Sequence, residues 1–345
     1  MVLTLLAAIF VFGLLVLVHE LGHFVTAKLT GMRVREFAIG FGPQIGSVQK
    51  GETIYSLRVV PLGGYNDIAG MDPEDTEAGD HGFSTKSVPA RMLVILAGSF
   101  MNVILPLVLF FGIFFFSGVH MPNPEPVLGK VIAGKPAAVA GLQQGDRIVS
   151  IDGNAVATWK DFVSTVAAAD GQTELSVTVE RDGQTLTTGI TPSYDPTTKR
   201  SLVGVMNDSL VTHPGLVESW NLALDSTWHV IRMMVDGLYR IVLELSGENL
   251  AGPVGIAQMA GEAAEMGLVP LLNFAALLSL NLAVINMFPL PGLDGGHFLG
   301  LCFEAVRGRA LSPKSLQIAQ GVGVALILLL MIYVTRNDVI RALHL

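Results

Sequence analysis

The stretch His19-Glu20-Leu21-Gly22-His23 decides the fold, because it follows directly on an apolar run, residues 2–18. Every residue of that run is apolar or neutral, and as a helix continued to about residue 29 it is long enough to cross a bilayer. A signal peptide is disfavoured, since no Lys or Arg precedes the run and no small-residue cleavage site follows it. Ionisable side chains inside a membrane span are costly and usually functional. We therefore expect a polar functional centre on a membrane helix.

The composition is that of a membrane protein. Of the 345 residues, 51% are hydrophobic and 14% are charged, and the mean hydropathy is +0.56; a soluble domain carries about 25% charged residues. The net charge of −8 argues against nucleic acid as a partner, because phosphate binding needs clustered Lys and Arg. The single cysteine, Cys302, excludes an intramolecular disulfide and a thiolate zinc cluster. Any metal must therefore be bound by His, Asp or Glu.

Three further apolar stretches predict membrane helices, at residues 88–118, 269–301 and 316–334. With four spans, both termini lie on the same side of the membrane. Basic residues flank the first connection and fill the last one (Lys28, Arg33, Arg35, Arg58, Lys86 and Arg91, then Arg307, Arg309 and Lys314). Because cytoplasmic loops carry an excess of Lys and Arg, we expect these two connections in the cytoplasm and the segment after the second span outside.

That outer segment, residues 119–193, reads as a small β-rich domain with strands at residues 175–179 and 186–190. The stretch Gly141-Leu-Gln-Gln-Gly-Asp-Arg-Ile-Val-Ser-Ile-Asp-Gly153 resembles the signature of a PDZ domain. PDZ domains bind extended peptides by strand addition, so the resemblance implies binding of peptide tails. A structural spacer or lid is the alternative.

Residues 194–268 are expected to form a strand after the PDZ domain and then an amphipathic helix. The apolar residues of that helix recur in steps of four and three (Leu224, Trp228, Ile231, Val235, Leu238, Val242 and Leu245). Charged residues on its other faces make it too polar for a lipid span. We expect it to lie on the outer membrane surface or to pack between the PDZ domain and the helix bundle.

The opening motif has the form H-E-x-x-H, which on a helix places His19 and His23 one turn apart, so that both can bind one Zn²⁺. Glu20 would project beside the metal, where a carboxylate can take a proton from water. A catalytic zinc usually has three protein ligands. Among residues 269–301 the only ionisable side chains are Asp294 and His297, and from spacing alone they are rivals for the third position.

Asp294 lies in a stretch rich in proline and glycine, Asn286-Met-Phe-Pro-Leu-Pro-Gly-Leu-Asp-Gly-Gly-His297. These residues break a helix, which inside a membrane is tolerable only where protein or water satisfies the freed backbone. A break of this kind is what a membrane-embedded active site requires.

The two motifs together resemble the site-2 protease family of intramembrane zinc metalloproteases, most closely the bacterial regulator-of-sigma-E type with a PDZ insert. The likeness covers nearly the whole chain. Further matching motifs are Gly40-Phe-Gly-Pro43, Pro61-Leu-Gly-Gly-Tyr65, Ala97-Gly-Ser-Phe-Met-Asn102 and Gly252-Pro-Val-Gly-Ile256.

The resemblance implies His19, His23 and Asp294 as zinc ligands and Glu20 as the general base. His297 then contacts a ligand or packs nearby. The resemblance also implies substrate contacts from three asparagines and two prolines (Asn102, Asn281, Asn286, Pro289 and Pro291). An amide can donate to and accept from an unwound peptide. Hydrogen bonding between helices is the alternative for the asparagines.

In this family, residues 36–65 correspond to a membrane-associated β-hairpin beside the active site, with strands clearest at residues 39–41 and 55–60. An ordinary cytoplasmic loop fold is the alternative. The chain departs from the family in carrying one PDZ domain where the best-known sigma-E regulators have two. Ser99 also replaces a frequent proline, and Asn66-Asp67 replaces an apolar-basic pair. We expect neither replacement to touch the metal chemistry.

The predicted fold is a polytopic α-helical membrane protein with an inserted β-rich PDZ domain and a membrane-associated β-hairpin. Its parts are two membrane segments of a protease core, residues 1–118 and 269–345, separated by the PDZ domain and by residues 194–268. The expected location is the bacterial inner (plasma) membrane, with the PDZ domain periplasmic. His19 lies about 27 Å along its helix, which places the metal near the cytoplasmic side.

The expected reaction is hydrolysis of peptide bonds in transmembrane segments of single-span proteins, with Zn²⁺ as cofactor. By analogy the substrates are anti-sigma factors of a sigma-E-type stress response, or signal peptide remnants. The alternatives are a non-catalytic PDZ adaptor and a metal transporter. The intact H-E-x-x-H motif opposes the first, and the small number of intramembrane carboxylates opposes the second.

Overall fold

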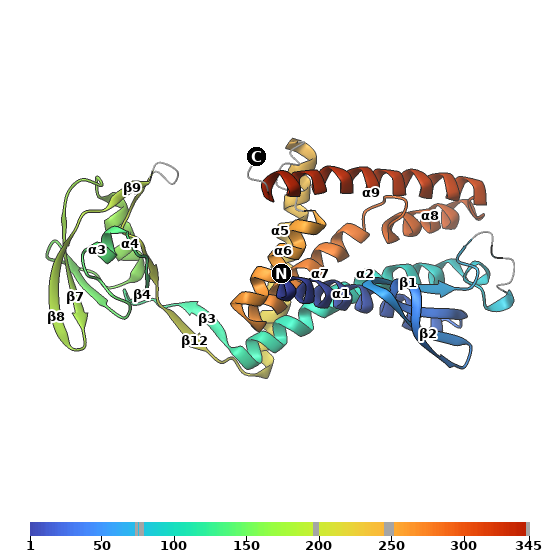
Figure 1. The fold of residues 1–345 in the computed structure, drawn as a ribbon, viewed down its shortest axis with the longest axis horizontal. Coiled ribbons are helices and arrows are strands. Elements are labelled where there is room, and N and C mark those ends of the chain that lie inside the picture. Colours follow the sequence, from blue (N-terminus) through green and yellow to red (C-terminus); the bar gives the residue numbers. More distant parts are fainter. Residues whose placement is uncertain (73–74, 76–78, 196–199, 245–251, 343–345) are drawn as a thin grey trace. The chain divides into compact units, whose positions relative to one another are not determined.

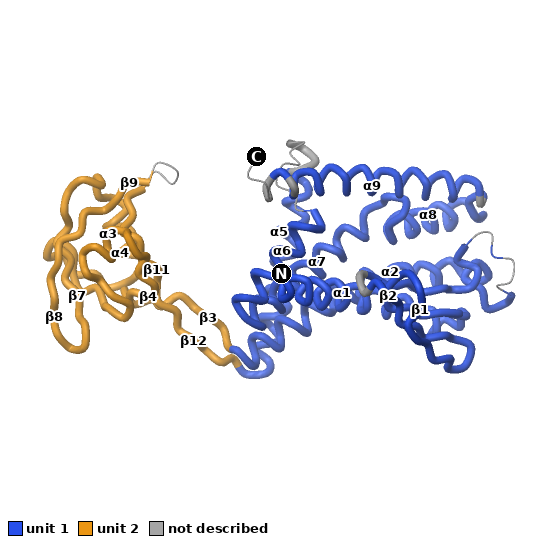
Figure 2. Tube along the Cα trace, viewed as in Figure 1, with its two compact units in different colours: residues 1–117, 215–345 blue, residues 118–214 orange. Residues whose placement is uncertain are grey.

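A computed structural model describes residues 1–345 except 73–74, 76–78, 196–199, 245–251 and 343–345. The chain divides into two compact units (Figure 2). Unit 1 comprises Met1–Ser117 and Gly215–Leu345, and unit 2 comprises Gly118–Pro214. The β-rich unit is therefore inserted into a helical one, as predicted.

Unit 1 is a bundle of helices with one β-hairpin (Figure 1). Its helices are α1 (Val2–Leu29), α2 (Val88–Gly112) with a π-helical turn η3 (Ile113–Ser117), α5 (Leu216–Glu244), α6 (Pro253–Met266), α7 (Leu268–Asn286), α8 (Asp294–Arg307) and α9 (Pro313–Ala342). Among the described residues, four helices are long and apolar enough to cross a membrane: Val2–Leu29, Val88–Ser117, Leu268–Asn286 and Lys314–Asp338. The predicted number of spans is confirmed, and the helices lie where they were predicted except that the third ends at Asn286 rather than near residue 301.

The predicted third span is interrupted in its second half. α7 ends at Asn286, and α8 begins at Asp294 after a turn that contains Pro289 and Pro291. The turn folds back so tightly that a Cβ on Gly295 would lie 2.3 Å from the Phe288 carbonyl oxygen. Only glycine fits at this position, which explains the Gly-Gly pair after the aspartate.

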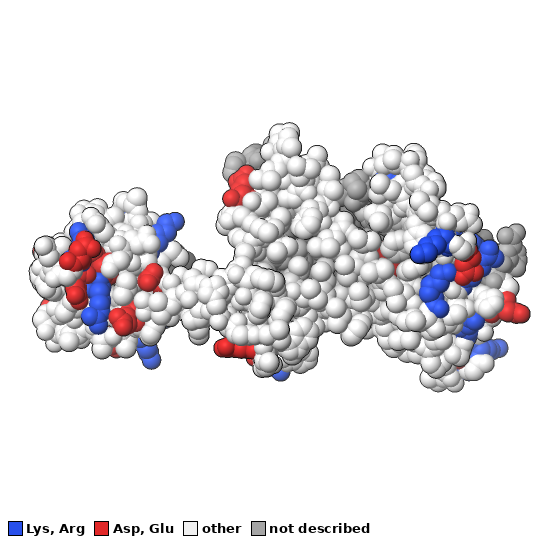
Figure 3. All heavy atoms as spheres, turned by 90° about the horizontal axis from the view of Figure 1, so that it is seen from below, with Lys and Arg blue, Asp and Glu red and all other residues white. Residues whose placement is uncertain are grey.

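The helices of unit 1 pack through small residues, as membrane helices commonly do. One cluster joins α1, α2, α6 and α7 through Ala7, Val11, Leu15, Leu105, Ala260 and Ala275. Many large apolar side chains remain exposed on α1, α2 and α9. Figure 3 shows this as a broad uncharged surface over the helices, with charged atoms gathered at the hairpin end of unit 1. That pattern fits a bundle surrounded by lipid.

The hairpin consists of β1 (Val34–Lys50) and β2 (Thr53–Ile68), and both strands bend. Residues 36–39 pair with residues 64–67 on one side and with residues 54–57 on the other. Within the described part of the chain no other strand pairs with this sheet, so residues 64–67 form an open edge. The hairpin packs against α1.

Unit 2 has a four-stranded sheet in the order β6-β5-β7-β8, with the helices α3 and α4 beside it (Figure 1). The elements are β5 (Arg147–Ile151), β6 (Asn154–Ala155), β7 (Leu175–Arg181), β8 (Gln184–Ile190), α3 (Pro136–Val139) and α4 (Trp159–Ala168). Three two-stranded pairs complete it: β3 (Val119–Pro122) with β12 (Ser209–Thr212), β4 (Leu128–Val131) with β11 (Val205–Asn207), and β9 (Ser193–Asp195) with β10 (Arg200–Leu202). The two predicted strands are β7 and β8.

The boundary predicted at residue 193 falls inside unit 2. The unit extends to Pro214 because β11 and β12 return to pair with β4 and β3 near its beginning. No local pattern reports such a pairing, since it joins segments about 80 residues apart.

The helix predicted as amphipathic is α5, and it packs along α2, η3 and α7. The face that packs overlaps the apolar stripe of the sequence pattern only in part, at Ile231. Ser219, Ala223 and Thr227 are at most 4% exposed, whereas Trp228 is 55% exposed. Small side chains let helix backbones approach closely, and the larger apolar ones are left on an adjacent face. Leu245, the last residue of the predicted stripe, lies outside the described residues.

Candidate active site

Three side chains that could bind a metal converge from α1 and α8. The Nε2 atoms of His19 and His23 lie 3.2 Å apart. The Oδ2 atom of Asp294 lies 3.5 Å from the first of them and 3.7 Å from the second. Among the described residues, these three form the group of His, Cys, Asp and Glu side chains that could bind a metal. His297 follows Asp294 by one turn of α8 and is not in this group.

The separations fit a zinc ion. Zinc–ligand bonds are about 2.0–2.1 Å long, so ligand atoms around a tetrahedral zinc lie roughly 3.3–3.5 Å apart. The two histidines are 9% and 8% exposed, which shields the centre from bulk water. Histidine nitrogens and a carboxylate are ligands that zinc accepts. With three protein ligands, a tetrahedral site keeps one position for water or substrate.

One face of α2 orients the two histidines. The Nδ1 atom of His23 lies 2.8 Å from the Val94 carbonyl oxygen, which can only accept, so this nitrogen carries the proton and Nε2 keeps its lone pair. The side-chain amide of Asn102 lies 3.1 Å from Nδ1 of His19. Gly98, between them on the helix, leaves the space that the two rings occupy, because a Cβ there would lie 2.3 Å from Nε2 of His23.

The environment of Asn102 also fits a bound metal. Asn102 is fully buried, and its Oδ1 atom has no hydrogen-bond partner. A metal on Nε2 of His19 leaves the proton on Nδ1, which then needs an acceptor. Turning the amide by 180° presents its oxygen to that proton and removes the buried oxygen without a partner. This placement favours a role in orienting His19 over the predicted direct contact with substrate.

Asp294 is the first residue of α8, and two contacts of α2 position it. The Ser99 hydroxyl donates to Asp294 Oδ2 over 3.3 Å. Farther along, Arg91 and Glu304 form a two-pronged ion pair, with N–O distances of 2.6 and 3.0 Å, that ties α8 to α2. Both charged side chains are nearly buried. Residues of α2 therefore contact His19, His23 and Asp294, and Arg91 of α2 also holds α8.

Glu20 contacts the hairpin. The side-chain NH₂ of Asn66 donates to Glu20 Oε2 and to the Glu20 backbone oxygen, each over 2.7 Å. The expectation that the two departures from the family pattern do not touch the metal chemistry is therefore wrong. Asn66 contacts the predicted base, and Ser99 contacts the predicted ligand Asp294. Neighbouring residues of a strand face opposite sides of the sheet. The sequence therefore indicates that Tyr65 and Asn66 face opposite sides, and this is the signal that could have directed attention to a contact of Asn66 with α1.

The remaining predicted residues lie at the break between α7 and α8. Asn286 ends α7 and is partly exposed, and its side chain has no hydrogen bond within the described residues. Pro289 and Pro291 lie in the turn that follows. Asn281 lies more than one turn earlier on α7 and is partly buried. Of the residues predicted to bind substrate, Asn286, Pro289 and Pro291 therefore lie near the start of α8.

A polar cluster inside the hairpin fixes its strands beside the site. Ser56 and Tyr65 donate to the Glu36 carboxylate over 2.5 and 2.7 Å, and Arg58 donates to it over 2.7 Å. Burial opposes ionisation of Glu36, but these hydrogen bonds and the Arg58 charge outweigh it and hold the pKa of Glu36 below its ordinary value. The carboxylate is therefore charged at neutral pH and joins three segments of the bent sheet.

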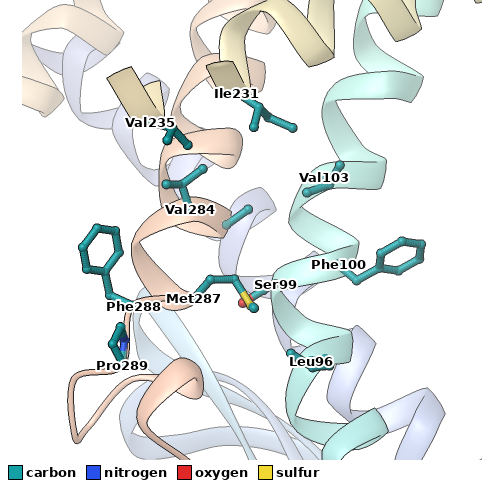
Figure 4. Close-up of a pocket in the computed structure, with 11 residues that line it drawn as sticks. Leu96, Ser99, Phe100, Val103, Ile231, Val235, Val284, Met287, Phe288 and Pro289 are labelled. Carbon is teal, nitrogen blue, oxygen red and sulfur yellow. The ribbon is translucent and has the colours of Figure 1, made fainter. Parts of the chain in front are cut away.

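A cavity of about 580 Å³ opens between α2, α5 and α7 (Figure 4). Its lining is apolar except for Ser99, and includes Leu96, Ile231, Val284 and Met287. One lining residue, Ser99, links the cavity to the candidate metal site, because its hydroxyl donates to Asp294. The fold and site together define a membrane-embedded metallohydrolase centre.

Comparisons with known proteins agree with this class. The model of peptidase family M50 matches residues 7–330. The zinc metalloprotease RasP of Bacillus licheniformis is 34% identical over 422 aligned residues, which cover 98% of this chain and 99% of the relative. The regulator of sigma-W protease RasP of Bacillus subtilis is 32% identical over 418 residues, 98% of each chain.

Among solved structures, the PDZ domain of an SdrC-like protein from Listeria monocytogenes is 19% identical to this chain. It covers 26% of this chain and 93% of its own, with a TM-score of 0.23.

This chain belongs to peptidase family M50, the site-2 proteases. It is a zinc metalloprotease of the membrane-embedded type. The family membership overrules the alternatives of a non-catalytic adaptor and a metal transporter.

Proposed function

We propose that this protease hydrolyses peptide bonds in, or at the edge of, transmembrane segments of single-span proteins. The observation that carries the proposal is the apolar cavity between α2, α5 and α7, whose lining residue Ser99 donates a hydrogen bond to Asp294. An apolar cavity suits a substrate segment that arrives from lipid rather than from water. The reaction is then one step of regulated intramembrane proteolysis.

A substrate helix must unwind before it can be cut, because its carbonyl groups are engaged in i→i−4 hydrogen bonds. The open edge at residues 64–67 offers backbone groups for an unwound segment to pair with, which offsets the bonds that the helix loses. The partly exposed amide of Asn286 and the turn with Pro289 and Pro291 offer further contacts. These residues support binding of an extended peptide.

The chemistry follows from the ligand set and its neighbouring carboxylate. Bound by His19, His23 and Asp294, a zinc ion supplies Lewis-acid chemistry that withdraws charge from a peptide carbonyl and makes water easier to deprotonate. Glu20 takes the proton from the attacking water and delivers it to the leaving amine. Val94 and Asn102 hold the imidazole rings so that both Nε2 atoms face the same point.

The substrate class proposed is the anti-sigma factor, with signal peptide remnants as the second candidate. A relative that is 32% identical over nearly its whole length is named regulator of sigma-W protease. A sigma-W-type response therefore has more support for this chain than the sigma-E response of the initial resemblance. Both candidates are single-span segments of the kind that the cavity suits.

The proposed location is the bacterial inner membrane, with unit 2 on the outer side and the active site near the cytoplasmic side. The basic residues of the first and last connections support this orientation. Unit 2 is proposed to be a PDZ domain that binds peptide tails, on the basis of its signature and its β-rich fold. Protease added to intact spheroplasts should cut unit 2, whereas cutting only in inverted vesicles would reverse the orientation.

The decisive experiment compares the wild type with Glu20→Gln in detergent. Zinc is quantified in both, and cleavage of an anti-sigma factor and of a signal peptide remnant is followed. About one zinc per chain in both proteins, with cleavage by the wild type alone, supports the proposal. Equal cleavage by Glu20→Gln would remove Glu20 from the base role. Cleavage of soluble unfolded peptides in preference to either membrane substrate would refute the substrate class.

A further inference from the structure

We propose that Asn66 of β2 is a positioning residue for the general base, and that it ties the hairpin to the Glu20 carboxylate. The proposal rests on the proposed catalytic role of Glu20. The two hydrogen bonds of Asn66 to a single residue of α1 carry the argument.

The direction of these hydrogen bonds is determined by their chemistry. The Asn66 nitrogen lies 2.7 Å from Glu20 Oε2 and 2.7 Å from the Glu20 backbone oxygen. A carbonyl oxygen only accepts, and so does an ionised carboxylate. The NH₂ group, with its two donors, must therefore face them. By bridging the backbone and the side-chain end of the same residue, it restricts the rotation of the Glu20 side chain.

A second contact holds the hairpin at the same part of α1. The rings of Phe37 and Phe24 pack edge to face with their centroids 5.1 Å apart. Phe37 is paired with Asn66 across the sheet, and Phe24 is one helical turn from Glu20. The preceding residue of β2, Tyr65, is fixed by its hydrogen bond to Glu36. Asn66 is thus held from both sides of its strand.

The consequence concerns catalysis rather than binding. A glutamate has several rotatable bonds, and a base must lie within hydrogen-bond reach of the proton that it removes. A misplacement of about 1 Å can cost roughly 100-fold in rate. Since residues 64–67 also form the open edge proposed to receive the substrate, ordering of that edge and orientation of the base are coupled through one side chain.

The test uses the full chain with Asn66→Ala, Asn66→Asp and Asn66→Gln, and Gln49→Ala as the control. The control removes an exposed side-chain amide of the same hairpin, outside the edge at residues 64–67. We expect kcat to fall about 10- to 100-fold for the first two variants, with KM within about twofold and zinc content unchanged. Asn66→Gln, which keeps the donors, should recover part of kcat, and Gln49→Ala should match the wild type.

Thermal unfolding gives a readout that does not depend on activity. Asn66→Ala should lower the unfolding midpoint more in the wild-type background than in a Glu20→Ala background, because Glu20→Ala has already removed the side-chain hydrogen bond and keeps only the one to the backbone oxygen. Equal shifts in both backgrounds would overturn the contact.

Two kinetic outcomes would also overturn the proposal. One is an unchanged kcat in Asn66→Ala. The other is a rise in KM alone, which would make the hairpin a substrate-binding element without influence on the base. Wild type and Glu20→Gln run in the same assay separate these results from failure of the proposed function, in which the wild type itself does not cut. In that case the comparison of unfolding midpoints still tests whether Asn66 and Glu20 are in contact.

Discussion

Val94, Gly98 and Asn102 follow one another by one helical turn each on α2, and all three lie against His19 or His23. The spacing of four puts them on one face of the helix. The Val94 carbonyl oxygen and the Asn102 amide orient the imidazole rings. Gly98, which has no side chain, leaves room for them. The histidines are therefore positioned as much by α2 as by the helix that carries them.

Gly98→Ala should abolish zinc binding and cleavage. The added methyl group would lie 2.3 Å from Nε2 of His23 and 2.7 Å from Cε1 of His19, so the rings must move away from the ligand position. Zinc content and cleavage of the test substrate measure the effect. Gly112→Ala, on the same helix with nothing within 4 Å of its added Cβ, is the control and should keep both properties. A zinc-loaded Gly98→Ala would contradict the packing argument.

Asp146→Asn should destabilise unit 2 by about 3–5 kcal/mol, because it breaks a buried ion pair. Asp146 is fully buried, and it accepts hydrogen bonds from Arg181 over 2.6 and 2.7 Å and from the Gln143 N–H over 2.8 Å. The position lies in the Gly-Asp of the PDZ-like signature. Limited proteolysis of unit 2 in the full chain measures the loss, and unchanged resistance would contradict it.

The same carboxylate makes unit 2 sensitive to acid. Burial opposes the charge of Asp146, but the Arg181 guanidinium and the Gln143 N–H outweigh it and lower its pKa. A lowered folded-state pKa contributes stability that is complete above the unfolded pKa of about 3.9 and is lost as the pH falls through the folded value. Proteolytic resistance of the wild type should therefore fall below about pH 4, and that of Asp146→Asn should depend less on pH there.

At the scale of elements, the ion pair of Arg91 with Glu304 sets the position of α8 against α2. Arg91→Ala should lower stability by about 3 kcal/mol, since it leaves a nearly buried carboxylate without its partner. It should also weaken zinc binding, because α8 begins with the ligand Asp294. The exchanged pair Arg91→Glu with Glu304→Arg should recover part of both. Zinc titration and thermal unfolding provide the measurements. If the exchanged pair recovers neither property, the fit of the two side chains, rather than their opposite charges, holds α8 against α2.

Asp338 links two other elements in a comparable way. It is 5% exposed and accepts hydrogen bonds from the backbone N–H groups of Gly252 and Gly255, over 3.0 and 2.9 Å, at the start of α6. A carboxylate at a helix N-terminus satisfies free N–H groups and interacts favourably with the helix dipole. The end of α9 is thereby joined to α6, and the Gly-Pro-Val-Gly motif acquires a structural explanation.

At the scale of the whole molecule, the candidate zinc site joins α1 to α8, which are distant in sequence. Removal of zinc with a chelator should abolish cleavage and lower the unfolding midpoint, because three clustered ligands lose their common partner. Added zinc should restore both. At a zinc concentration about 100 times the Kd, the stabilisation amounts to roughly 2.7 kcal/mol. Glu20→Gln, which keeps the ligands, should show the same thermal response, and a midpoint indifferent to zinc would contradict the role of the metal as a link.

Much of the fold follows from local pattern. Long apolar runs predict membrane helices because every backbone polar group in lipid must be satisfied within its own segment. This reasoning places all four spans, and the Pro-Gly stretch predicts the break before Asp294. The alternating residues of unit 2 likewise predict β7 and β8. In each case the determining interactions lie within a few residues of one another.

The sequence by itself determined the metal chemistry, because two histidines one turn apart and an adjacent glutamate are a local feature of one helix. Only the tertiary structure brought Asp294 beside those histidines and extended unit 2 to Pro214. It also decided that the small residues of α5 form its buried face. It likewise brought Asn66 into hydrogen-bond contact with Glu20, and Ser99 with Asp294, where the sequence pattern indicated no contact. These contacts join segments that are distant in the chain, and their geometry depends on how closely backbones approach, which residue spacing does not encode.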